Sequence, residues 1–146
     1  MRDRMEFISH SPAETESLGE KFGRAVQHGF VFALSGDLGA GKTQLVKGIA
    51  RGLGVTARVH SPTFTLVNEY GGGRSKLFHL DLYRLETPAQ ILSAGIEEFL
   101  APDGVAVIEW AERIYDLQFA IYDLKKVQIE ILNESARKII YDDFGA

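Results

Sequence analysis

The segment from Gly36 to Thr43 has the residue types and the spacing of a loop that binds phosphate groups. It fits the pattern G-x-x-x-x-G-K-[ST] at every fixed position. Glycine lets the backbone fold so that its N–H groups converge on phosphate oxygens, where a side chain would block the approach. Lys42 supplies a mobile positive charge for the β- and γ-phosphates, and the Thr43 hydroxyl can bind Mg²⁺. The predicted ligands of a nucleoside triphosphate are Gly36, Asp37, Leu38, Gly39, Ala40, Gly41, Lys42 and Thr43.

Two later runs of mostly apolar residues each end in a carboxylate, Asp81 and Glu109. Strands of this form deliver an acid to the Mg²⁺ of many ATPases. One carboxylate can hold the metal, directly or through water, while the other orients the attacking water. Glu109 is the stronger candidate because its run is apolar throughout; a structural role at a strand end is the alternative for both. The predicted catalytic residues are Lys42, Asp81 and Glu109, and the predicted Mg²⁺ ligands are Thr43, Asp81 and Glu109.

The elements that must position these residues can be predicted from the flanking sequence. Residues 30–35 form a short apolar run, which is typical of a buried parallel strand. Residues 44–53 repeat an apolar residue every fourth position, so a helix should begin at Lys42 and direct its positive end at the phosphates. Strand, loop and helix therefore appear in the order that a phosphate-binding loop requires.

The N-terminal region predicts an edge strand at residues 6–9 and then a helix. Ser11 should cap this helix, with Pro12 in its first turn and Glu14 completing a capping box, and Gly29 should end it. The start of the helix could lie near the nucleotide, so Ser11 or Thr15 could contact the base or the sugar. The interpretation favoured for both is a helix cap and a polar residue of the first turn.

Residues 61–70 and 77–82 predict a β-hairpin joined by a glycine-rich turn. Thr63 and Thr65 lie where many nucleotide-binding domains keep a switch segment that responds to the γ-phosphate; ordinary strand residues are an equal alternative. His79 should point to the opposite face from Leu80, as a packed or hydrogen-bonded histidine rather than a ligand.

A capping box at Thr87 predicts a helix that Gly95 breaks, and residues 127–131 and 137–141 predict a terminal hairpin. Trp110, the one tryptophan, follows Glu109 and could make a functional contact or belong to the core. Arg137 could reach a phosphate or a base, although a solvated strand face is the favoured interpretation.

Length and composition indicate one globular domain over residues 1–146. There are 16 basic and 20 acidic residues and no cysteine, so disulfides and cysteine-based metal sites are excluded. The net charge of −4 predicts that any work on RNA or DNA is indirect, through a partner. No run is long enough to span a membrane, and we expect a cytoplasmic protein without membrane contact.

Four segments together resemble the TsaE (YjeE) family of bacterial P-loop ATPases: GDLGAGKT at 36–43, SPTFTLVNEY at 61–70, HLDLYRL at 79–85 and IEWAER at 108–113. The resemblance covers nearly the whole chain in order. It implies a three-layer P-loop NTPase-like α/β fold with a mostly parallel mixed sheet, helices on both faces and antiparallel hairpins.

The resemblance also implies a function. It implies a weak Mg²⁺-dependent ATPase that joins TsaB and TsaD to form threonylcarbamoyladenosine beside the anticodon of tRNAs that read codons beginning with A. It implies phosphate contacts for Lys42, Mg²⁺ ligation by Thr43 and Glu109, and assistance from Asp81. Trp110 would belong to the functional surface, with Thr63 and Thr65 in a switch-like segment.

Two alternatives to an ATPase subunit remain open. A small nucleoside or small-molecule kinase shares the strand–loop–helix start, but usually carries an arginine-rich lid, which is not visible after Glu109. A nucleotide-dependent binding switch would use hydrolysis only to time an interaction. No N-K-x-D motif follows the loop, which argues against a GTPase.

Overall fold

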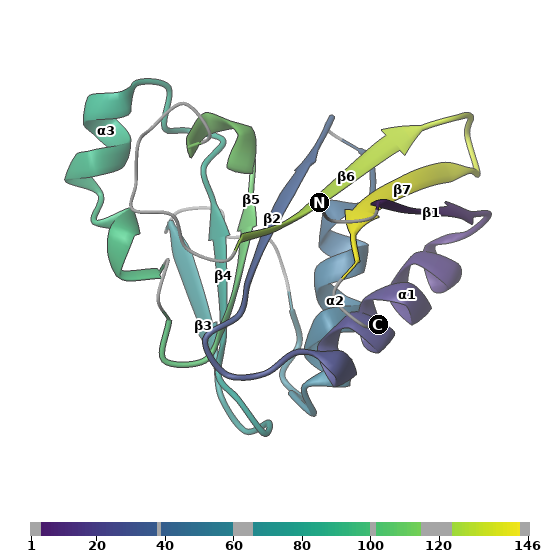
Figure 1. Ribbon diagram of the computed structural model, residues 1–146, viewed down its shortest axis with the longest axis horizontal. Coiled ribbons are helices and arrows are strands. Elements are labelled where there is room, and N and C mark those ends of the chain that lie inside the picture. Colours follow the sequence, from purple (N-terminus) through teal and green to yellow (C-terminus); the bar gives the residue numbers. More distant parts are fainter. Residues whose placement is uncertain (1–3, 38, 60–65, 100–101, 115–123, 144–146) are drawn as a thin grey trace.

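The computed structural model describes residues 4–37, 39–59, 66–99, 102–114 and 124–143 (Figure 1). Its strands are β1 (Arg4–Ser9), β2 (Val31–Gly36), β3 (Val67–Tyr70), β4 (Leu77–Asp81), β5 (Val105–Glu109), β6 (Leu124–Ile131) and β7 (Arg137–Asp142). Its helices are α1 (Pro12–Ala25), α2 (Lys42–Gly52) and α3 (Pro88–Ser93), with short 3₁₀ helices at Ile96–Phe99 and Ala111–Ile114.

All seven strands belong to one sheet, in the spatial order β1-β7-β6-β2-β5-β4-β3. The neighbours β6-β2-β5-β4 are parallel, whereas β1-β7, β7-β6 and β4-β3 are antiparallel. Strand β5 is buried along its whole length, which explains its uninterrupted apolar sequence. The predicted α/β fold, with its parallel centre and antiparallel hairpins, is confirmed.

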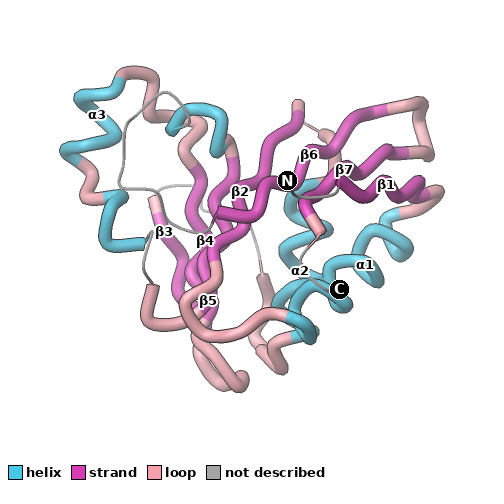
Figure 2. Tube along the Cα trace, viewed as in Figure 1, coloured by secondary structure: helices cyan, strands magenta, loops and turns pink. Residues whose placement is uncertain are grey.

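Helices lie on both faces of this sheet, as predicted (Figures 1 and 2). Helices α1 and α2 pack on one face, where Phe22, Leu45 and Ile49 share a core cluster with strand residues such as Phe32. On the other face, Ile91 of α3 and the 3₁₀ helices cover a second cluster. The result is a three-layer arrangement, with α1 and α2 on one face of the sheet and α3 on the other.

Close contact between α1 and α2 sets the position of α2. A Cβ atom at Gly48 would collide with the carbonyl oxygen of Glu16, and one at Gly19 would collide with that of Leu45. The two backbones therefore touch through glycine, which no larger residue permits. Because α2 begins at Lys42, this contact also holds the phosphate-binding loop against the sheet.

Two details of α1 differ from the prediction. The helix ends at Ala25 rather than near Gly29, because Val26 turns to an extended conformation and buries its side chain in the core. Gly29, at φ +91°, instead forms the turn into β2. Ser11 caps the helix as predicted, but the Glu14 carboxylate accepts from the N–H of His10 at 2.6 Å, one residue earlier than a capping box requires.

The remaining predicted elements are found, although residues 61–65 of the predicted first hairpin lie outside the described residues. Thr87 and Gln90 form the complete capping box of α3, and the chain turns at Gly95 before the 3₁₀ helix. The hairpins β3–β4 and β6–β7 are both present. Across the described ranges, no helix is long and apolar enough to cross a membrane.

Candidate nucleotide site

The phosphate-binding loop connects the end of β2 to the start of α2. Gly39 and Gly41 have φ values of +81° and +103°, which non-glycine residues rarely adopt. Gly41 is the N-cap of α2, and no side chain caps that end. The first N–H groups of α2 therefore face the loop, as an anion site at a helix N-terminus requires. Leu38, also predicted as a ligand, lies outside the described residues.

Lys42 is almost fully buried at this site. Its Nζ donates to the carbonyl of Gly36 at 2.5 Å and lies 3.8 Å from the ring centroid of Trp110, as a cation–π contact. Burial lowers the pKa of Lys42, and the nearby carboxylates of Glu109, Glu112, Asp81 and Asp37 partly oppose this. The ammonium is thus held in the loop by a carbonyl, a ring face and surrounding negative charge.

The two predicted carboxylates lie side by side at the ends of neighbouring parallel strands. Asp81 of β4 is the register partner of Glu109 of β5. An Asp81 oxygen accepts from the N–H of Tyr83 at 2.9 Å. Burial raises the pKa of Asp81, the Tyr83 bond lowers it, and the charge of Glu109 raises it further. The two acids therefore lie at the same edge of the sheet.

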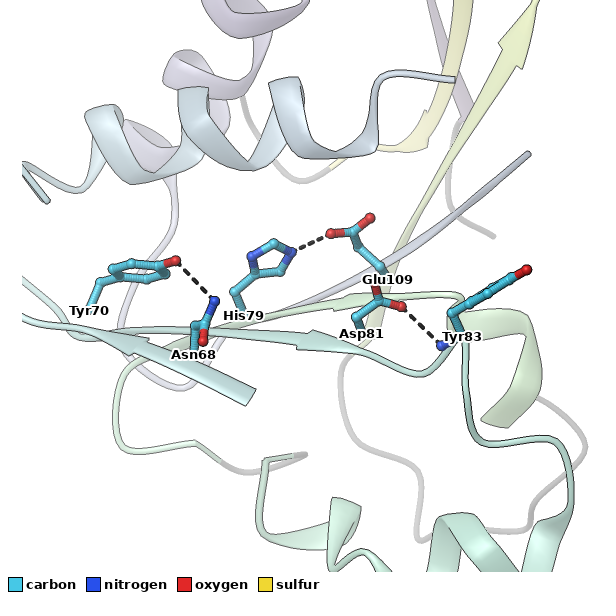
Figure 3. Close-up of polar contacts among 6 residues, drawn as sticks. All are labelled: Asn68, Tyr70, His79, Asp81, Tyr83 and Glu109. Carbon is cyan, nitrogen blue, oxygen red and sulfur yellow. Dashed lines mark hydrogen bonds and ion pairs between the residues drawn. The ribbon is translucent and has the colours of Figure 1, made fainter. Parts of the chain in front are cut away.

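His79 is fully buried and contacts Glu109 through its Nε2 (Figure 3). This confirms a hydrogen-bonded histidine, but its partner was not predicted. Residues 77, 79 and 81 of a strand share one face, so His79 and Asp81 both lie toward α2. That alternation is the one sequence signal that places His79 beside the carboxylates.

A cavity of about 270 Å³ brings the loop and the carboxylates together. Its lining residues are Gly39, Ala40, Gly41, Lys42, Thr43, Gln44, Asp81, Glu109 and Trp110. A second hollow, of about 480 Å³, lies beside α1 and α2 and contains none of the predicted residues. The predicted lysine, hydroxyl and carboxylates therefore converge on one pocket.

Trp110 has an unusual backbone as well as an unusual position. Its φ of +59° is the one left-handed value at a non-glycine residue in the described part of the chain. Strain of this kind persists where the surrounding structure holds it, and often at functional sites. The ring lies between Lys42 and Tyr83, whose ring centroid is 5.0 Å away. Trp110, which follows Glu109 in the sequence, therefore forms part of the pocket wall.

Arg137 is not on a solvated strand face, which was the favoured interpretation. Its Nε donates to the carbonyl of Ala40 at 3.1 Å and its Nη2 to that of Gly39 at 3.2 Å. Its Nη1 donates to the carbonyls of Asn133 and Ala136 at 2.7 and 3.0 Å. Arg137 thus connects the β6–β7 hairpin to the phosphate-binding loop. The sequence contains no signal for a contact across 97 residues.

Ser11 and Thr15 are occupied in other contacts and do not line the pocket. The Ser11 hydroxyl accepts from the N–H of Glu14. The Thr15 hydroxyl is buried and lies 2.7 Å from that of Ser9. Thr63 and Thr65 lie outside the described residues. Nucleotide contacts from Ser11 and Thr15, and a switch role for the two later threonines, stay predictions.

The donors of the pocket fit Mg²⁺ bound together with a nucleotide. Within the described ranges, no cluster of three histidine or acidic residues could hold a metal alone. Mg²⁺ at triphosphate sites needs no such cluster, because phosphate and water oxygens complete its shell around one or two carboxylates. Thr43, Asp81 and Glu109 supply oxygen ligands of that type on one pocket wall.

Comparisons of this chain with known proteins all point to one family. The profile of the family described as "Threonylcarbamoyl adenosine biosynthesis protein TsaE" matches residues 9–139. The tRNA threonylcarbamoyladenosine biosynthesis protein TsaE of Nostoc sp. is 50% identical over 105 residues, which span 68% of this chain and 64% of that protein. Its counterpart in Aquifex aeolicus is 38% identical over 92% of both chains.

A solved structure shows the same fold. The crystal structure of YdiB from Bacillus subtilis superposes with a TM-score of 0.81 at 31% sequence identity, over 99% of this chain and 88% of that chain. The sequence profile, the relatives and the fold agree with the resemblance read from the motifs. The chain belongs to the TsaE family.

Proposed function

We propose that this protein binds ATP with Mg²⁺ and hydrolyses it slowly, as an accessory subunit of the machinery that forms threonylcarbamoyladenosine on tRNA. The observation that carries the proposal is the convergence of Lys42, Thr43, Asp81 and Glu109 on one pocket beneath a glycine loop. A lysine, a hydroxyl and two carboxylates are groups that suit ATP hydrolysis, because its catalysis consists of positioning and electrostatic stabilisation.

Each residue has a distinct part in this proposal. The loop N–H groups and the Lys42 ammonium bind the β- and γ-phosphates. The Thr43 hydroxyl and the Glu109 carboxylate would hold Mg²⁺, which neutralises charge on the transferred phosphoryl group. Asp81 would assist at the metal from the same edge of the sheet. Trp110 covers the ammonium of Lys42 and limits the access of bulk water from that side.

The biological role is inferred from the relatives. Proteins that are 38–50% identical to this chain are named for tRNA threonylcarbamoyladenosine biosynthesis. A subunit that acts through TsaB and TsaD, in the cytoplasm, accords with a net charge of −4, because direct tRNA binding usually needs a basic surface.

Two variants test the ATPase proposal. Turnover is measured as phosphate release in the absence of a phosphoryl acceptor, and nucleotide affinity is measured by titration with fluorescent ADP. Glu109→Gln should lower the turnover rate about a hundredfold with little change in affinity, because its carboxylate acts on metal and water rather than on the nucleotide. Lys42→Ala should lose nucleotide binding. Glu69→Gln, an exposed strand residue paired with Lys76, serves as the control and should behave as wild type.

Unchanged turnover in Glu109→Gln would contradict its assigned role. Phosphate transfer only to an added acceptor would favour a kinase instead. The partner proposal is tested separately, by size-exclusion chromatography with TsaB and TsaD in the presence of ATP, ADP or no nucleotide. Absence of association under all three conditions would overturn that part alone.

A further inference from the structure

Among the residues that the structure describes, the buried histidine of β4 has one hydrogen-bond partner, which is a predicted catalytic carboxylate. Because a carboxylate only accepts, the Nε2–H of His79 donates to Oε2 of Glu109 (Figure 3). Both side chains are shielded from water, at 0% and 4% exposure. A hydrogen bond to a charged group in such surroundings is stronger than one in solvent.

Core packing does not account for a histidine at this position. The other ring nitrogen of His79, Nδ1, is buried and has no hydrogen-bond partner among the residues that the structure describes. A buried nitrogen without a partner destabilises the fold, and an aliphatic residue would fill the space without that cost. Among the described residues, the ring therefore hydrogen-bonds through Nε2 to Glu109 and through no other atom.

The geometry directs Glu109 toward the pocket. His79 lies two residues before Asp81, one pleat deeper in the sheet, and reaches across to the strand-end carboxylate of β5. It holds Oε2, while the second oxygen of Glu109 points away from the imidazole (Figure 3). Asp81 is held in the same manner, by one oxygen on the N–H of Tyr83. Each acid thus has one oxygen fixed by the protein.

We propose that His79 is a positioning residue for hydrolysis: it fixes the side-chain rotamer of Glu109 so that one carboxylate oxygen faces Mg²⁺ and the attacking water. This inference rests on the proposed ATPase function. Neighbouring groups that orient a metal ligand typically change activity or metal affinity by ten- to a hundredfold when they are lost, as the rotamer freedom of the ligand returns.

Two substitutions separate positioning from packing. His79→Leu keeps the volume and removes the donor, and should lower turnover about tenfold. His79→Gln keeps an N–H near the position of Nε2 and should recover much of that loss. ADP affinity without Mg²⁺ should be unchanged in both, whereas the gain in affinity on adding Mg²⁺ should shrink in His79→Leu. Leu77→Ala, a buried neighbour on the same face of β4, is the control that perturbs packing without touching Glu109.

A double-mutant cycle gives the decisive comparison. If His79 acts through Glu109, His79→Leu should cause no further loss of turnover in a Glu109→Gln background. Additive losses, or turnover in His79→Leu equal to or above wild type, would overturn the proposal while leaving the ATPase intact. If the wild-type protein does not hydrolyse ATP, the ATPase proposal is overturned. The contact between His79 and Glu109 is then tested by urea unfolding. There the double variant should be less destabilised than the sum of His79→Leu and Glu109→Gln, and additivity would overturn the contact.

Discussion

At the scale of single residues, Lys42 shows that a group needed for phosphate binding can lower the stability of the fold. The residue is 6% exposed, and burial lowers its pKa despite four carboxylates nearby. A lowered lysine pKa means that the folded protein disfavours the charged form relative to water. Phosphate binding requires a positive charge in the pocket. The fold is therefore less stable than it would be without the buried ammonium.

We predict that Lys42→Met stabilises the protein by about 1 kcal/mol while abolishing nucleotide binding. Methionine fills similar space without a charge to desolvate, and this gain should exceed the loss of the Gly36 bond and the cation–π contact. Urea unfolding measures the change. Lys47→Met, at an exposed position of α2, should change stability by less than about 0.5 kcal/mol. A destabilised Lys42→Met would show that the ammonium is held more favourably than its burial suggests.

At the scale of elements, the C-terminal hairpin supports the phosphate-binding loop. Arg137 opens β7 and donates to two carbonyls of the loop and two of its own turn. These bonds fix the carbonyls of Gly39 and Ala40, and so hold the backbone of the loop from the hairpin side. The hairpin, which carries no recognisable motif, thereby contributes to the order of the site.

Arg137→Lys should weaken ADP binding about tenfold, since an ammonium cannot reproduce two directed hydrogen bonds to Gly39 and Ala40. The titration with fluorescent ADP used for the other variants measures it. Lys138→Ala, one residue along β7 and paired with Glu6 at 3.4 Å, is the matched control and should keep wild-type affinity. If Arg137→Lys binds ADP as tightly as wild type, the loop is ordered without the hairpin.

At the scale of the whole molecule, distant parts of the chain share one core. Tyr141 of β7 packs edge-on against Phe22 of α1, with centroids 4.8 Å apart, and Phe22 stacks on Phe32 of β2. The first and last strands also belong to this sheet, since β1 pairs with β7 at its margin. Burial, with the charge of Asp143, raises the pKa of Tyr141.

This pKa shift predicts how stability changes in alkali. The folded protein holds the phenolic proton of Tyr141 more tightly than the unfolded chain, so the free energy of unfolding falls as pH rises above about 10. Tyr141→Phe removes the ionisable group and should lose less stability than wild type between about pH 9 and about pH 11. Thermal unfolding across this range measures both. Parallel curves for the two proteins would contradict the prediction.

Much of the molecule follows from local patterns along the chain. The glycine spacing, the apolar run of β2 and the helix at Lys42 need only neighbouring residues to be recognised. That Asp81 and Glu109 each end a strand also follows from their runs, whereas their pairing depends on the strand order and register of the sheet. The bounds of α1 were less certain, since core burial of Val26 outweighed the stop signal at Gly29.

Contacts that join distant segments were decided only by the tertiary structure. His79 and Glu109 are 30 residues apart, and Arg137 and Ala40 are 97 apart. Lys42 meets Trp110 because the chain takes a left-handed conformation just after β5. Strand register and helix packing set these distances, and neither is written in the spacing of a motif. The sequence therefore supplies the chemical groups, and the packed sheet decides which of them touch.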